Sequence, residues 1–224
     1  MALNEAKTAK RTQEQRSREM RQRLIEATLA CLEADGYAGA TISRVVESAG
    51  VSRGAHLHHF ESKAALLHAA AEHLMKSVFR ELGRIVLSVE NAEDRLPILI
   101  DAIWEQVFCS RDGKVILELL IAARTDKELA AHLQKLFLRL REMFAEAAKH
   151  YFTAAPGLSL EVEDIFLQSQ WLLRGMLLDY PLVDDPNAFR TSLDNWTKMA
   201  QSLVIARTDV TGPPPKPDWW DEQL

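Results

Sequence analysis

The sequence has few of the residues that disulfide scaffolds and membrane proteins depend on. Its 224 residues include two cysteines, Cys31 and Cys109, and both lie in apolar helical patterns, which disfavours a disulfide framework or a thiolate metal site. No apolar run approaches the roughly 20 residues that span a bilayer, and the N-terminus lacks the apolar core of a signal peptide. We therefore expect a cytoplasmic protein with no membrane partner.

The sequence also lacks an excess of positive charge, since its 27 basic and 32 acidic side chains give a net charge of −5. The charges are unevenly placed. Residues 1–23 carry seven basic and three acidic side chains, a surplus of four positive charges, so residues 24–224 carry nine net negative charges. A basic end on an acidic body indicates that only the N-terminal part meets an anionic partner. A flexible, solvated leader over residues 1–17 is the alternative explanation of the same charge.

Helical periodicity dominates the chain. Apolar residues recur at spacings of three and four, and neither an alternating strand pattern nor a glycine-rich phosphate loop is present. We therefore predict an all-α fold of about nine helices. The expected helices cover residues 17–35, 42–48, 52–59, 62–87, 92–109, 113–123, 126–152, 160–179 and 187–207.

Two short helices joined by a tight turn are predicted for the segment TISRVVESAGVSRGAHLHHF, residues 41–60. Thr41 can cap the first helix by accepting a bond from a free backbone N–H, and Gly50 ends it. Helix, turn and helix is the layout of a DNA-binding motif whose second helix enters the major groove. Arg53, on the first turn of that helix, has a planar fork suited to guanine O6 and N7. The residues expected on this turn are Ser52, Arg53 and Gly54.

A family resemblance is carried by the run G-Y-x-x-x-T-I-x-x-V-x-x-x-A-G-V-S-R-G-x-x-x-H-H-F-x-S-K-x-x-L-L, residues 36–67. Its many fixed spacings resemble the DNA-binding domain of the TetR family of transcriptional regulators. The resemblance covers residues 18–77 and implies a three-helix helix-turn-helix domain, followed by a larger helical effector-binding and dimerisation domain over residues 78–212. It implies DNA contacts from Thr41, Arg44, Ser52, Arg53, Gly54, His56, His58, His59 and Lys63.

The sequence departs from the family pattern at position 57, where leucine replaces the usual tyrosine and its phosphate contact. We expect Leu57 to become a packing residue and His56 to take over a polar contact. His58 and His59 are adjacent and cannot share a helix face, so we expect one to reach DNA and the other to pack beside Phe60. These histidines lack the convergent geometry of a metal site, and no metal is predicted.

The helix predicted for residues 160–179 is apolar nearly all round and therefore has to be covered on two sides. Together with residues 187–207 it predicts a four-helix bundle across a two-fold axis, and thus a homodimer. A single deeply buried core helix is the alternative. The expected interface residues are Trp171, Arg174, Leu178, Phe189, Leu193, Trp196, Ala200 and Leu203.

Aromatic side chains of the body are candidates for the wall of a cavity that takes a small apolar or aromatic effector. Each of them is also a candidate for plain core packing. The expected wall residues are Trp104, Phe108, Phe137, Met143, Phe144 and Trp171. Polar anchors for such a ligand cannot be ranked from the sequence; the candidates are His132, His150, Arg124, Arg174 and Asp179.

These patterns predict a ligand-responsive DNA-binding regulator, a repressor released from a palindromic operator by its effector. An all-helical enzyme would need paired carboxylates, a Glu-x-x-His metal pair or a Cys–His–Asp set, and we find none, so we predict no catalytic residue and no cofactor. A helical protein-interaction adaptor is a third hypothesis. It leaves Ser52, Arg53 and Gly54 and the basic N-terminus unexplained.

The proline-rich segment from Pro213 to Leu224 cannot continue a helix and is predicted to be an extended tail. Trp219 and Trp220 would expose a large apolar surface if they were left in water. The tail is therefore expected either to dock on the body or on a second subunit, or to remain a free end.

Overall fold

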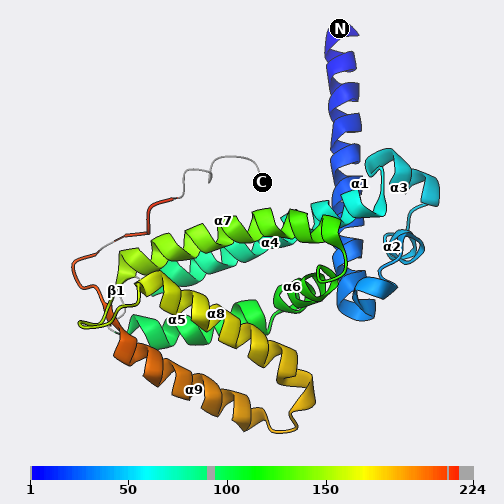
Figure 1. Ribbon diagram of the computed structural model, residues 1–224. Helices are drawn as coiled ribbons and strands as arrows, with labels where there is room; N and C mark the ends of the chain where they lie inside the picture. Colours follow the sequence, from blue (N-terminus) through cyan, green and yellow to red (C-terminus); the bar gives the residue numbers. More distant parts are fainter. Residues whose placement is uncertain (1, 90–93, 211, 217–224) are drawn as a thin grey trace. The chain divides into compact units, whose positions relative to one another are not determined.

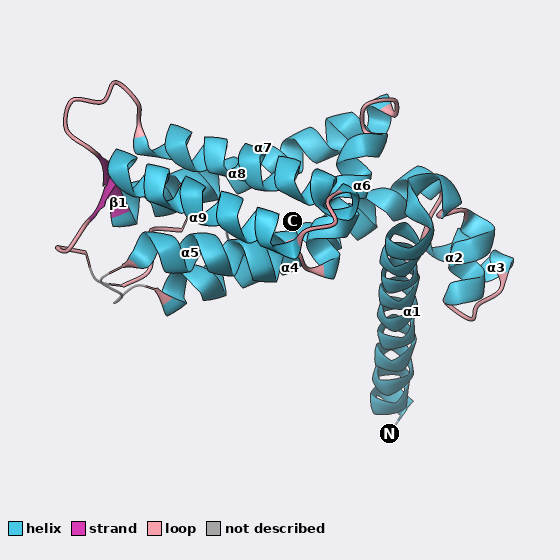
Figure 2. Ribbon diagram, turned by 90° about the horizontal axis from the view of Figure 1, so that it is seen from below, coloured by secondary structure: helices cyan, strands magenta, loops and turns pink. Residues whose placement is uncertain are grey.

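The computed structural model describes residues 2–89, 94–210 and 212–216, and in them the protein is built almost entirely from helices (Figures 1 and 2). The prediction of an all-α fold with nine helices is confirmed for these residues. The α-helices are α1 (Ala2–Gly39), α2 (Ile42–Ser48), α3 (Arg53–His59), α4 (Lys63–Ser88), α5 (Arg95–Ile103), α6 (Arg111–Ala122), α7 (Lys127–Tyr151), α8 (Val162–Asp179) and α9 (Pro186–Leu203). A π-helical turn η1 (Trp104–Phe108), a 3₁₀ turn η2 (Tyr180–Leu182) and two strands, β1 (Phe152–Ala154) and β2 (Val204–Ala206), complete the described elements.

The chain divides into two compact units. The N-terminal unit comprises Met1–Leu74 and Glu118–Leu133, and the body unit comprises Met75–Leu117 and Gln134–Leu224. The sequence predicts a single boundary between residues 77 and 78. The structure differs because the end of α6 and the start of α7 pack with the N-terminal unit, although both lie far along the chain.

The first helix is longer than the sequence prediction. We expect a flexible leader over residues 1–17, but α1 is helical from Ala2. Residues 2–17 contain no glycine or proline and are rich in Ala, Glu, Gln, Lys and Arg, which all favour a helix. At the other end the predicted stop is correct in position, because the backbone at Gly36 adopts φ +66 and breaks the helical path.

The core of the N-terminal unit forms where α1, α2 and α3 meet. Leu24 and Leu32 of α1, Val46 of α2, and Phe60 after α3 are all buried. Local caps set the helix starts that this packing uses: the Thr41 hydroxyl accepts a bond from the Arg44 amide at 3.2 Å, and Ser62 accepts one from Ala65 at 3.0 Å. Each such cap satisfies a backbone donor that the helix leaves free.

The body unit contains a short antiparallel ladder that the sequence did not predict. Strands β1 and β2 pair Phe152 with Ala206 and Ala154 with Val204. They tie the end of α7 to the end of α9. Three-residue strands are too short to produce a recognisable alternating pattern, so periodicity could not reveal them.

The region predicted as one helix over residues 92–109 contains a change of helical period. After α5 the chain widens into η1, where the Cys109 amide donates to the Trp104 carbonyl at 2.9 Å. Such π-turns are rare and often mark functional sites. Immediately after it, α6 starts in very close contact: a Cβ placed on Gly113 would lie 2.3 Å from the carbonyl oxygens of Val107 and Phe108.

Candidate nucleic-acid interface and ligand cavity

Helices α2 and α3 form the predicted helix-turn-helix. The turn between them passes through Gly50 at φ +62, a left-handed conformation that glycine adopts without steric cost. The Val51 amide then donates to the Val46 carbonyl at 3.0 Å and closes the turn. Val45 and Val46 are buried and hold α2 against the rest of the unit. These local interactions fix the direction in which α3 leaves the turn.

The first turn of α3 is open to solvent. Ser52, Arg53 and Gly54 are all exposed, and so is His58 further along. Arg53 donates a hydrogen bond to the hydroxyl of Ser43 on α2, which holds its side chain along the motif. A helix whose first turn exposes an arginine between the small residues Ser52 and Gly54 suits contact with base edges, although Arg53 would have to release Ser43 to use its whole fork.

The structure corrects the expectations for His56 and Leu57. His56 is only 3% exposed and stacks near Phe60 at 6.5 Å between ring centroids, whereas Leu57 is 68% exposed. Positions 56 and 60 are four residues apart and share the inner face of the motif. Burial lowers the pKa of His56, and in the described residues its Nε2 has no hydrogen-bond partner. His56 is therefore a neutral core residue, and Leu57 takes the surface position.

The other predicted DNA contacts are engaged within the N-terminal unit. Arg44 pairs with Asp35 (Nε to Oδ2, 2.9 Å) and with Glu47 (3.5 Å), and these carboxylates raise the pKa of its guanidinium. The Lys63 ammonium lies 5.1 Å from the centre of the Tyr37 ring. His59 is half-buried, and its carbonyl oxygen accepts a bond from α1. Arg44 would therefore have to exchange partners to reach a phosphate.

A hydrogen-bond hub centred on Tyr37 was not predicted from the sequence. The Tyr37 hydroxyl donates to Asp126 Oδ2 at 2.5 Å, and the other carboxylate oxygen of Asp126 accepts from the Leu129 amide at 3.0 Å and caps α7. The Tyr37 amide also donates to Glu118 at 3.4 Å. Tyr37 lies in the run that resembles the TetR family, but Asp126 is 89 positions away, so no local pattern could connect them.

This hub shifts the pKa values of Tyr37 and Asp126 in opposite directions. Burial, followed by the bond to the Asp126 carboxylate, raises the pKa of Tyr37 to about 12. The bonds from the Leu129 amide and the Tyr37 hydroxyl lower the pKa of Asp126. At neutral pH the pair is therefore a neutral phenol that donates to a carboxylate, and such charge-assisted bonds are stronger than bonds between neutral groups.

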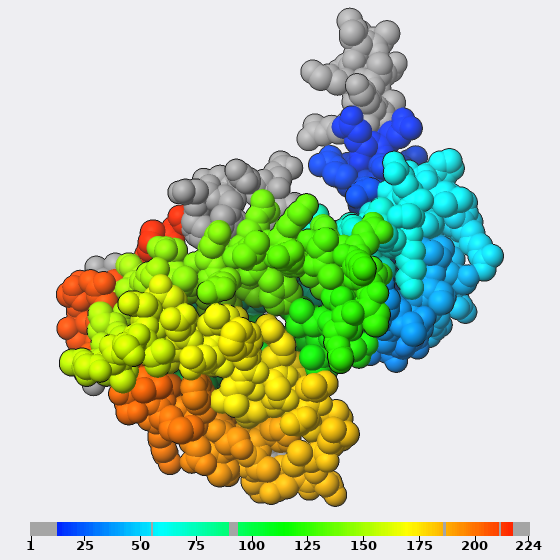
Figure 3. All heavy atoms as spheres, viewed as in Figure 1, coloured from blue at the N-terminus to red at the C-terminus, as the bar shows by residue number. Residues whose placement is uncertain are grey.

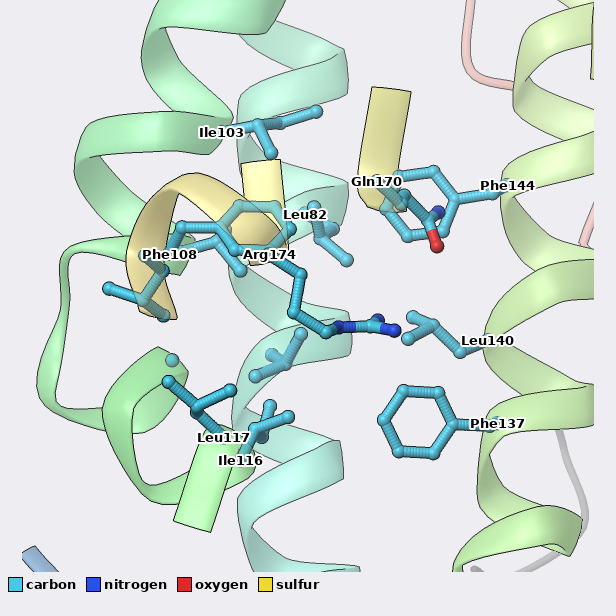
Figure 4. A pocket seen from close by; sticks show the side chains of 14 residues that line it. Leu82, Ile103, Phe108, Ile116, Leu117, Phe137, Leu140, Phe144, Gln170 and Arg174 are labelled. Atoms are coloured by element: carbon cyan, nitrogen blue, oxygen red, sulfur yellow. The ribbon is translucent and has the colours of Figure 1, made fainter. Parts of the chain in front are cut away.

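The body unit contains a partly open cavity with a volume of about 40 Å³ (Figure 4). Its wall is almost wholly apolar, and three of the predicted residues, Phe108, Phe137 and Phe144, line it. The complete lining is Val78, Leu82, Ile103, Val107, Phe108, Gly113, Ile116, Leu117, Phe137, Leu140, Phe144, Gln170, Arg174 and Leu177.

The remaining predicted wall residues lie elsewhere. Trp104 is 8% exposed and stacks on Phe108 and Phe189 in the core of the body. Met143 lines a separate apolar groove of about 180 Å³ formed by α4, α7 and residues 213–216. Trp171 is 60% exposed and is not a wall residue of either cavity. Aromatic character alone cannot distinguish wall, core and surface positions.

The outer faces of α8 and α9 carry exposed apolar side chains. Trp171 and Leu178 of α8 are 60% and 49% exposed, and Met199 of α9 is 54% exposed. In the space-filling view these two helices, yellow and orange, lie at the surface of the body (Figure 3). Leu203 and Trp196 are half-buried.

Four of the predicted interface residues have to be reassigned. Phe189, Leu193 and Ala200 are buried because this stripe of α9 faces the protein's own body. Arg174 lies in the cavity. A helix that is apolar on several sides does not reveal from its sequence which side faces inward, and this is why the prediction chose the wrong stripe of α9.

The described residues offer little for other chemistry. Among them, no group of three or more His, Cys, Asp or Glu side chains is placed to hold a metal ion. Burial raises the pKa of both Cys31 and Cys109, so neither thiol is activated as a nucleophile. In the same part of the chain, no helix combines the length and the apolarity that a membrane crossing requires. Trp219 and Trp220, for which we expect docking or a free end, lie outside the described residues.

The fold and the exposed α3 define a helix-turn-helix DNA-binding protein with an additional helical body. The model of the bacterial regulatory proteins of the tetR family matches residues 24–70. Curated regulators match further along the chain: an uncharacterized HTH-type transcriptional regulator of Mycobacterium tuberculosis is 30% identical over 156 residues, which cover 70% of this chain and 77% of that protein. The chain belongs to the TetR family of transcriptional regulators.

Two further relatives define the extent of the similarity. The HTH-type transcriptional regulator CymR of Pseudomonas putida is 35% identical over 132 residues, which are 59% of this chain and 64% of CymR, slightly less than two thirds of its length. A solved regulator from Saccharomonospora viridis, in complex with choline, has the same fold with a TM-score of 0.66 at 17% identity, covering 84% of this chain and 98% of that one. At that identity the likeness concerns the fold alone.

Proposed function

We propose that the protein is a repressor that binds a palindromic operator as a homodimer and leaves it when a small apolar or aromatic molecule occupies the body cavity. The observation that carries the proposal is the exposed first turn of α3. Arg53 is exposed there, which supports a bidentate contact with guanine, the commonest specific contact in the major groove. In a cell such a regulator acts in the cytoplasm, where its operator lies.

Exposed apolar side chains on α8 and α9 support a dimer. Trp171, Leu178 and Met199 are exposed on these helices, and such side chains favour burial against a second copy. Two-fold symmetry would then present two recognition helices to two half-sites about one helical turn, or a multiple of it, apart.

An effector site is supported by the cavity, because three phenylalanines and few polar groups are typical of a site for an apolar or aromatic molecule. The S. viridis regulator of similar fold is described with choline bound, so this fold accommodates small molecules. The two ligands need not be alike, because a shared fold does not imply a shared site chemistry.

Helix α6 offers a route from the cavity to the DNA-binding motif. Ile116 and Leu117 line the cavity, and the next residue, Glu118, accepts the bond from the Tyr37 amide in the N-terminal unit. An effector that displaces α6 therefore also disturbs the Tyr37 hub. A differential affinity of about 1–3 kcal/mol between the two states is enough to change operator occupancy 5- to 150-fold.

The test is binding to a duplex selected from a random library, followed by fluorescence anisotropy at several salt concentrations. Arg53→Ala should lose about 1–3 kcal/mol of affinity and relax the base preference. Arg141→Ala, which removes an exposed arginine of α7, is the matched control and should bind normally. If Arg53→Ala retains both affinity and base preference, α3 does not read the operator in the proposed way.

A further inference from the structure

Arg174 is the one charged side chain among the residues that line the body cavity. It extends from α8 across the cavity toward Phe137 and Leu140 of α7 (Figure 4). Its guanidinium carbon lies 5.4 Å from the centre of the Phe137 ring. Gln170, one helical turn earlier on α8, is the other side chain of the lining that can donate a hydrogen bond.

The Arg174 guanidinium has no anionic partner within the described part of the chain. It contacts the Phe137 ring, and no carboxylate of the described residues lies within ion-pairing distance. Burial lowers the pKa of Arg174, and no neighbouring charge contributes to that shift. Arginine nevertheless remains protonated in proteins, so the cavity holds a permanent positive charge.

A cation in an apolar cavity is costly unless an anion completes the site. The position has a second property: the five donors of arginine form a rigid fork that fits the two oxygens of a carboxylate. The phenylalanines and leucines around it can cover only an apolar body. The wall therefore combines one anion-binding group with an otherwise hydrophobic surface.

We propose that the effector is a small organic acid, a single carboxylate on an aromatic or aliphatic body, whose carboxylate pairs with Arg174. This inference rests on the proposed function, because it names the chemical class of that effector. The body of the acid lies against Phe108, Phe137 and Leu140. The side-chain amide of Gln170 donates a further hydrogen bond to a carboxylate oxygen of the acid. Quaternary ammonium compounds are disfavoured by like-charge repulsion.

The size of the cavity adds a requirement. Its volume of about 40 Å³ holds only a few water molecules, since each needs about 10–15 Å³ of such space, whereas a dry cavity of roughly 150 Å³ holds benzene. The wall therefore has to move outward when an acid binds. Arg174, which crosses the cavity, and Phe108, which belongs to the irregular η1 turn, are the side chains whose rearrangement creates the most room.

The experiment uses the 224-residue protein and four carboxylates: benzoate, phenylacetate, 3-phenylpropanoate and octanoate. Each is paired with its primary amide, which has the same body without the charge. Binding is measured by isothermal titration calorimetry and by the shift in melting temperature. For the acid that binds most tightly, we expect at least a tenfold preference over its amide.

Arg174→Met removes the charge with little change in length, and it should reduce the acid-to-amide ratio to near one. Arg174→Lys keeps the charge without the planar fork and should retain part of the preference. Arg141→Met, at an exposed position of α7, is the matched control and should keep the full ratio. Circular dichroism establishes that each variant is folded.

The proposal is overturned if no carboxylate binds at millimolar concentration, if the amides bind as tightly, or if Arg174→Met keeps the preference for the acid. Operator release is recorded separately by anisotropy. Acids that bind through Arg174 without releasing the operator would support the ligand class and contradict the effector role. Uncharged or cationic compounds that alone release the operator would support the effector role and overturn the ligand class.

Discussion

Replacing Tyr37 with phenylalanine removes one hydroxyl from the hub that joins α1 to the start of α7. The lost bond is short, 2.5 Å, and its acceptor is the carboxylate of Asp126. Asp126 keeps its bond from the Leu129 amide, so the α7 cap survives. The substitution therefore tests the long-range link without unravelling the helix that it reaches.

The expected loss of stability follows from the type of bond. Hydrogen bonds to charged groups contribute about 1.5–3 kcal/mol and typical bonds about 0.5–1.5 kcal/mol; because both partners are partly exposed, we expect a value between these two classes, about 1–2 kcal/mol. For a protein of this size each kcal/mol corresponds to a change in melting temperature of about 2–4 °C, so Tyr37→Phe should melt about 2–8 °C lower.

The pH dependence of the folding stability provides a second, independent test of this bond. The folded-state pKa of Asp126 is lowered, so the stability that this carboxylate contributes is present above its unfolded pKa of about 3.9 and is lost as the pH falls toward the folded value. Without the Tyr37 hydroxyl the shift should shrink, and the gap between the two proteins should close in acid.

Thermal and urea unfolding monitored by circular dichroism from pH 7 down to pH 3 measures both effects. Tyr180→Phe is the matched control, because this tyrosine is 48% exposed on the body. Equal melting temperatures for Tyr37→Phe and the parent protein, together with the same pH dependence, would refute the reasoning and show that water replaces the bond without loss.

Three further outcomes are expected. Lys63→Ala should weaken binding to all duplexes about equally and reduce the salt dependence, which anisotropy at several salt concentrations measures. Leu178→Glu should yield monomers in analytical ultracentrifugation because it places a charge in the proposed dimer interface, whereas Leu138→Glu on α7 should not. Without any ligand, Arg174→Met should raise the melting temperature by about 2–4 °C: the desolvation cost of an unpaired cation exceeds the roughly 0.5–2 kcal/mol of its interaction with Phe137. A lower melting temperature would mean that the cation stabilises the empty cavity.

The parts of the fold that depend on local chemistry could be predicted from the sequence. Thr41 and Ser62 cap helices with their own hydroxyls, and Gly36 and Gly50 supply the left-handed turns, so the helix-turn-helix was correctly predicted. Each of these signals lies within a few residues of the structure it sets, and needs no knowledge of the rest of the fold.

The parts that failed depend on which side of a helix faces the core. His56 and Leu57 are neighbours on a two-turn helix, and their predicted roles were exchanged because Phe60 and the first helix, not α3 itself, decide which of them is buried. Leu193 was assigned to the dimer interface for the same reason, whereas it is buried in the protein's own body. Arg174 appeared twice, as interface and as possible anchor, and only the three-dimensional packing of α7 against α8 places it in the cavity.

Gly113 has a consequence for comparing this protein with its relatives. A methyl group at this position would lie 2.3 Å from two backbone carbonyl oxygens, which cannot move aside as a side chain can. Alanine here would force the first turn of α6 away from η1, and with it Ile116 and Leu117. Relatives with glycine at this position can therefore have the same cavity geometry. In relatives with a side chain at this position, the backbone around the cavity has to be arranged differently. The residue at position 113 thus separates relatives whose ligands can be compared with those of this protein from relatives whose ligands cannot.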